Sequence, residues 1–134
     1  MLQDLPENEV HDIAIAVVLE SSTPVDQDWS VYLINLKEDP IDTVIVASKG
    51  YGILEGKEVK TSVLRHLIGD ISPLDYKLIE PIKNDLFGLS NEYWLSFYQG
   101  GVIFDKKFVF VPESIIEENM IPIPFIGKPG VMIR

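Results

Sequence analysis

Apolar and polar residues alternate with a period of two along much of this 134-residue chain. The alternation is clearest over residues 92–111, where two β-prone runs meet at Gly100-Gly101. A Gly-Gly pair adopts the positive φ angles of a two-residue hairpin turn without steric cost, so these residues predict a β-hairpin. Successive strand residues point to opposite faces, so Tyr93, Leu95 and Phe97 share one face. We expect that face to be core, because it can meet the phenylalanines of the second arm, Phe104, Phe108 and Phe110.

Five further segments carry apolar runs or alternation of strand length: residues 13–20, 29–36, 41–48, 58–68 and 76–82. The first is unbroken, which suits a strand covered on both faces, although Val10, Ile13 and Val17 also fit one face of a helix. Residues 58–68 are compatible with a helix capped at Thr61 or Ser62, but their alternation favours a strand. Pro81 favours an edge position or a bulge for the last segment, and glycines mark residues 49–56 as a loop.

The two ends of the chain differ from its middle. Residues 1–12 are acidic and polar, and we expect a loosely held arm. Residues 112–134 predict an extended, proline-rich tail that begins with one or two helical turns and ends in a short edge strand at 131–134. The tail is too apolar for a free terminus. We expect it to lie against its own domain or against a partner subunit.

Seven strands with little helix predict one all-β domain over residues 1–134, an antiparallel two-sheet sandwich. Three features support this further: a strand that contains Trp29, a Leu-x-x-x-Pro turn at residues 36–40, and an aromatic strand entered at Tyr93. This pattern is similar to that of immunoglobulin-like sandwiches, in which a tyrosine often locks the corner before such a strand. The disulfide cysteines of that pattern are absent from this chain.

The chain is acidic: 11 Lys and Arg against 21 Asp and Glu give a net charge of −10. Such a surface repels phosphate backbones and anionic lipid headgroups, so we expect neither nucleic acid nor membrane as a partner. The absence of cysteine excludes disulfides and thiolate metal sites. Acidic residues precede the apolar run at 13–19, which does not fit a secretory signal. We therefore expect the cytoplasm.

No sequence motif predicts catalysis, a metal or a cofactor. His11 and His66 lack the spacing of a metal site, and the chain contains no Gly-x-Ser-x-Gly elbow. The glycines of residues 49–56 do not match the spacing of a phosphate-binding loop. We assign no catalytic residue.

Two groups of residues are candidates for binding. Trp94 and Tyr98 lie on the strand face opposite to Tyr93, and would form an exposed aromatic platform if that face is outward; the alternative is that they face the core. The second group is the only concentration of basic residues, Lys49, Lys57, Lys60 and Arg65, which fall within seventeen positions next to His66. It is suited to an acidic arm of a neighbouring copy or to a small anionic ligand, and ordinary surface charge balance is the alternative.

From these observations we expect a non-catalytic interaction or assembly module whose partner is a protein, such as a second copy in a homo-oligomer. The alternative is an enzyme or a binder of small anions that uses residues 49–66, with Lys57, Lys60 or His66 in the site.

Overall fold

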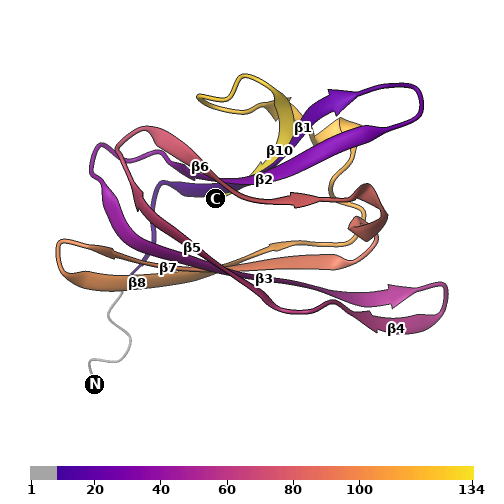
Figure 1. Cartoon of the computed structure of the whole chain (residues 1–134), viewed down its shortest axis with the longest axis horizontal. Helices are drawn as coiled ribbons and strands as arrows, with labels where there is room; N and C mark the ends of the chain where they lie inside the picture. Colours follow the sequence, from indigo (N-terminus) through magenta and orange to yellow (C-terminus); the bar gives the residue numbers. More distant parts are fainter. Residues whose placement is uncertain (1–8) are drawn as a thin grey trace.

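The computed structural model describes residues 9–134, so residues 1–8 of the predicted acidic arm lie outside the described part. Two antiparallel sheets face one another (Figure 1). Sheet 1 has the strand order β6-β2-β1-β10-β9. Its strands are β1 (Ile13–Ser22), β2 (Gln27–Asn35), β6 (Asp75–Ile82), β9 (Ile121–Pro122) and β10 (Pro129–Ile133).

Sheet 2 has the order β4-β3-β7-β8. The same edge of the long strand β3 pairs with two strands, β5 along its first part and β4 along its last part. Its strands are β3 (Ile41–Leu54), β4 (Lys57–Lys60), β5 (Leu64–Ile71), β7 (Ser90–Gln99) and β8 (Val102–Phe110). Within residues 9–134, the only helical elements are two 3-10 turns, η1 (Asn84–Leu86) and η2 (Glu117–Asn119). The predicted all-β architecture of two antiparallel sheets is confirmed.

The described residues form ten strands, so the expected number of about seven was too low. The glycine-rich residues 49–54 continue β3 instead of forming a loop, and they pair with β4. Residues 58–68 are extended and not helical, as their alternation favoured, but they divide into the end of β4 and the start of β5. The tail contributes β9 and β10, and β10 lies between β1 and β9 rather than at an edge.

The main core lies between the two sheets, and the central hairpin contributes its predicted face. Tyr93, Leu95 and Phe97 are at most 1% exposed. Gly100 and Gly101 both have positive φ, at 59° and 78°, as the predicted turn requires. The prediction for this hairpin is therefore confirmed.

A second, smaller core covers the outer face of sheet 1. It consists of Ala14, Ala16, Val18, Ile34 and Ile123. Four of these residues come from β1 and β2, while Ile123 belongs to the turn between β9 and β10, which folds over the sheet (Figure 1). Every residue from Ile13 to Val18 is at most 1% exposed, so β1 is covered on both faces as its unbroken apolar run predicted.

The immunoglobulin-like pattern is not confirmed. In immunoglobulin domains the tryptophan-bearing strand and the strand entered by the tyrosine lie in one sheet. Here Trp29 belongs to β2 of sheet 1 and Tyr93 belongs to β7 of sheet 2. In the part of the chain that the structure describes, no helix is long and apolar enough to cross a membrane.

Candidate functional site

Trp94 lies at the centre of the outer face of sheet 2. In register it is flanked by Ala47 of β3 and Lys107 of β8, and Ala47 is flanked in turn by Arg65 of β5. Directly paired residues share a face, so these four side chains form a row across the sheet. Because Tyr93 points into the core, Trp94 points outward, and its exposed fraction is 47%. Tyr98 follows on the same face with 40% exposed.

The carboxylate of Glu92 connects the charged and aromatic groups of this face. Glu92 is only 7% exposed. Its oxygens lie 3.8 Å from Lys49 Nζ and 4.0 Å from Lys107 Nζ, and Oε1 accepts a 3.3 Å hydrogen bond from the hydroxyl of Tyr51. Burial, together with the charge of Glu92, raises the pKa of Tyr51. The two lysines also lie over aromatic rings, Lys107 Nζ at 5.5 Å from the Trp94 centroid and Lys49 Nζ at 5.7 Å from that of Tyr51.

We call Lys49, Arg65, Glu92, Trp94 and Lys107 the Trp94 patch. With Ala47, Ser48 and Val63, four of these residues line a hollow of about 360 Å³. Three cations face one carboxylate here, so the patch is positive on an otherwise acidic molecule. Lys49 and Lys107, held by Glu92 and by aromatic rings, need little reordering to bind a partner.

The structure brings together some of the predicted binding residues and separates others. Trp94, Tyr98 and Arg65 share the outer face of sheet 2. Lys60 and Lys57 lie on β4, opposite Tyr51 and Leu54. His66, adjacent to Arg65, is paired with Val46, whose side chain is in the core, so the imidazole points inward.

Sequence reasoning missed Lys107, Glu92 and Tyr51 as members or neighbours of this site. A signal for Lys107 was present, because counting back along both arms from Gly100-Gly101 pairs it with Trp94. Alternation also placed Glu92 on the same face as Trp94. The proximity of Glu92 to Tyr51 had no such signal, because it depends on the pairing of β3 with β7, which are far apart in the sequence.

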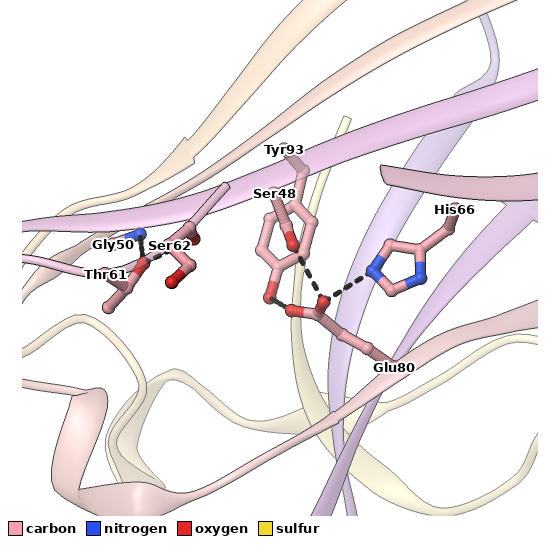
Figure 2. Close-up of polar contacts among 7 residues, drawn as sticks. All are labelled: Ser48, Gly50, Thr61, Ser62, His66, Glu80 and Tyr93. Atoms are coloured by element: carbon pink, nitrogen blue, oxygen red, sulfur yellow. Dashed lines mark hydrogen bonds and ion pairs between the residues drawn. The ribbon is translucent and has the colours of Figure 1, made fainter. Parts of the chain in front are cut away.

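A second polar cluster lies on the inner side of the molecule, around Glu80 (Figure 2). Glu80 belongs to β6, an edge strand that carries a bulge between its pairings with Val31 and Tyr32 of β2. The extra residue, Ile79, belongs to the core, and Glu80 pairs with Val31, which also points inward. The bulge thus turns both Ile79 and the Glu80 carboxylate inward, which bulges commonly do near functional sites. Pro81 predicted an edge position or a bulge; the edge position is confirmed, and a bulge lies nearby, at Ile79.

Three groups from sheet 2 converge on this carboxylate (Figure 2). Ser48 Oγ donates to Glu80 Oε1 over 2.8 Å, and His66 Nε2 lies 2.7 Å from the same oxygen. The hydroxyl of Tyr93 donates to Oε2 over 3.0 Å. Burial, reinforced by the charge of Glu80, raises the pKa of Tyr93, so this hydroxyl stays protonated and acts as a donor. We call Ser48, His66, Glu80 and Tyr93 the Glu80 cluster.

The order of groups in the Glu80 cluster does not suit nucleophilic catalysis. In a serine hydrolase triad the histidine lies between the serine and the acid, so that it can accept the serine proton. Here the carboxylate lies between Ser48 and His66, and both contact the same oxygen. The arrangement holds a carboxylate in place instead of activating a hydroxyl. Within residues 9–134, no group of three or more metal-ligating side chains converges.

Comparison of the chain with protein-family models, curated proteins and solved structures found no match.

Proposed function

We propose that this chain is a non-catalytic interaction module whose Trp94 patch binds an acidic protein surface, and that this surface belongs to a second copy of the chain. The observation that carries the proposal is the unequal cover of the two outer faces. The turn between β9 and β10 covers β1 and β2 on the outer face of sheet 1, where Leu78 of β6 stays 52% exposed, whereas the outer face of sheet 2 exposes Trp94, Tyr98 and Leu67, the last with 83% of its surface accessible. Exposed apolar groups rimmed by charge are typical of protein-binding surfaces.

Charge complementarity favours a second copy as the partner. Exposed acids and exposed isoleucines lie close together in the segment around η2: Glu113, Glu117, Glu118, Ile116 and Ile121. The three acids take part in none of the ion pairs between described residues. This acidic segment offers a second copy the opposite charge to the Trp94 patch, with apolar side chains to contact the indole ring.

The two surfaces are different parts of the molecule, and each copy contributes both. If both pairs of surfaces meet in one twofold interface the product is a dimer; if only one pair meets, the contact is heterologous and closes into a ring or extends as a filament. The order of groups around Glu80 supports a role without catalysis.

The cytoplasm is our proposed location, and fractionation of cells that express the tagged protein tests it.

Sedimentation velocity over a wide range of protein concentration tests the proposal. Trp94→Ala and Arg65→Glu should each weaken self-association of the wild-type protein, and added salt should do the same because it screens exposed charges. Val25→Ala is the matched control, because Val25 is 93% exposed but lies in the loop between β1 and β2. A wild-type protein that stays monomeric at every concentration would rule out the second copy as partner.

A charge-exchange experiment identifies the two surfaces. Arg65→Glu makes the patch more acidic, and the double variant Glu117→Lys and Glu118→Lys makes the acidic segment basic. We expect each variant alone to be monomeric and their mixture to associate, because the mixture again offers opposite charges. If the mixture associates no better than the separate variants, the acidic segment is not the surface that the patch binds.

A further inference from the structure

A pocket of about 480 Å³ opens beside the Glu80 cluster. It lies between β5 of sheet 2 and β6 of sheet 1, which belong to different sheets and are not paired. The cluster forms one polar side, and Leu64, Pro81, Ile82 and Leu86 form apolar walls. The volume is within the range of about 300–1,000 Å³ that is typical of small-molecule sites.

The segment that joins β4 to β5 borders this pocket and is held in place by hydrogen bonds (Figure 2). Thr61 Oγ1 accepts a 2.7 Å hydrogen bond from the Gly50 amide, and the Thr61 amide donates to the Gly50 carbonyl over 2.9 Å. A Cβ at Gly50 would lie 3.2 Å from Thr61 Cγ2, so glycine permits this close approach. These hydrogen bonds therefore fix one wall of the pocket.

The donors of the Glu80 cluster are used inside the cluster. The hydroxyl hydrogens of Ser48 and Tyr93 are directed at Glu80, and His66 Nε2 contacts it as well. The groups left for a ligand in this arrangement are acceptors, the hydroxyl oxygens of Ser48 and Tyr93. A carboxylate has about four lone-pair positions, and these three contacts occupy two on Oε1 and one on Oε2. One position on Oε2 remains.

These acceptors select the chemistry of the ligand. Glu80 is a carboxylate with only 13% of its side chain exposed, and its serine and tyrosine partners contribute dipoles but no full positive charge. We propose that the pocket binds a small organic cation, with an ammonium group at Glu80 and an apolar body between Leu64, Ile82 and Leu86. An ammonium group has three donors and no acceptor, so it complements the groups that remain.

A small anion, the alternative expected from the sequence, fits this pocket less well. Of the four predicted basic residues only Lys49 borders it, and the Lys49 ammonium lies 3.8 Å from Glu92 in the Trp94 patch. An anion would meet the Glu80 carboxylate, which already holds the one imidazole of the pocket, His66, at 2.7 Å. The two sites share Ser48 and Lys49 in their linings, but Glu80 borders only the inner pocket and Trp94 only the outer hollow, so variants of these two residues test the two proposals separately.

Three probes of the same shape test the proposal: benzylammonium, benzyl alcohol and benzoate. Each is added to the full-length wild-type protein in weakly alkaline buffer, and amide chemical shifts are followed by NMR. We expect benzylammonium to shift the amides of the Glu80 cluster and to bind at least about tenfold more tightly than benzoate, because a charged hydrogen bond is lost with the anion. Equal binding of all three probes, binding elsewhere, or no binding at all would overturn the proposal.

Variants separate the role of the carboxylate from that of the cavity. Glu80→Gln should abolish the preference for benzylammonium, and Glu58→Gln, which removes an exposed carboxylate from β4, should keep it. If Glu80→Gln does not fold, Leu64→Trp provides a second test, because Leu64 is 52% exposed at the pocket wall and a larger ring there should block entry. A Leu64→Trp protein that binds benzylammonium as the wild type does would place the ligand outside this pocket.

Discussion

Phe97 and Ser96 are neighbours in β7 that point to opposite faces of sheet 2. Phe97 is 1% exposed and stacks on Phe104 with ring centroids 5.3 Å apart, whereas Ser96 is half-buried on the outer face. Truncation of the ring leaves a cavity, so Phe97→Ala should lower the free energy of unfolding by about 3–5 kcal/mol. Ser96→Ala should change it by less than about 0.5 kcal/mol. Urea unfolding measures both values, and equal small losses would mean that the two faces are exchanged.

At the scale of single residues, sequence reasoning succeeded where a local signal determined the direction of a side chain. The turn at Gly100-Gly101 sets the register of β7 and β8, and alternation then assigns Tyr93 and Phe97 to the core. Glu80 is the opposite case. Pro81 indicated an edge position or a bulge, but the partners of the carboxylate come from β3, β5 and β7 of the other sheet. Periodicity holds no information about contacts between sheets.

At the scale of elements, β10 depends on one glycine for its position beside β1. Gly130 pairs with Val18, and a Cβ at Gly130 would lie 2.5 Å from the carbonyl oxygen of Val17 and 3.0 Å from Ile123 Cγ1. Because backbone cannot move aside as a side chain does, Gly130→Ala should destabilise the protein by about 1–3 kcal/mol. Gly88→Ala is the matched control. Its Cβ would lie 2.9 Å from Leu54 Cδ2, which is the end of a flexible side chain and can move aside. Thermal melting of both variants gives the comparison. A Gly130→Ala protein that melts at the wild-type temperature would contradict the close packing of β10 on β1.

The glycines of β3 explain why its length was underestimated. Gly50 and Gly52 resemble loop residues in the sequence, but Gly50 is a buried strand residue that lets Thr61 and Asn91 approach. The turn lies further on, at Glu55 and Gly56, whose φ angles are 51° and 75°. A glycine required for a close approach and a glycine required for a turn look alike in one sequence. Only the identity of the neighbouring strand separates them.

At the scale of the whole molecule, the two outer faces differ in what covers them. Apolar residues in the tail predicted that it lies on a surface, and the turn between β9 and β10 does so on the outer face of sheet 1, while Ile115 and Val131 of the tail belong to the main core. The sequence did not show which face would be covered, because the tail joins the sheet through β1, more than a hundred residues earlier in the chain. The same pairing leaves the outer face of sheet 2 open, and so leaves the Trp94 patch accessible.

One ion pair fastens the covering turn to sheet 1. Lys128 Nζ lies 2.8 Å from Glu20 Oε1, and the hydroxyl of Tyr32 donates to the other oxygen of Glu20. Burial alone would raise the pKa of Glu20, but the hydrogen bonds from Lys128, Tyr32 and Ser30 outweigh it and hold that pKa below its ordinary value of 4.5. Burial and the same carboxylate raise the pKa of Tyr32 to about 12, so Tyr32 remains a donor at neutral pH.

The lowered pKa of Glu20 makes the stability of the molecule depend on pH in a definite direction. A carboxyl group with a lower pKa in the folded state than in the unfolded chain stabilises the fold above the unfolded value, and this contribution is lost as the pH falls through the folded value. Glu20→Gln should therefore melt below the wild type at neutral pH, by the equivalent of less than about 1 kcal/mol because Lys128 is half exposed. The difference should shrink as the pH falls below 4.5.

Asp12→Asn is the control for this pH dependence. Asp12 pairs with Arg134 at 3.4 Å, but both side chains are more than half exposed, so its removal should change the melting temperature little at any pH. Scanning calorimetry of the wild type and both variants across the acidic range makes the comparison. A Glu20→Gln deficit that stays constant down to the lowest pH would mean that the carboxylate does not hold the turn by its charge. The covering of sheet 1 would then depend on the packing of Ile123 and the pairing of β10 with β1.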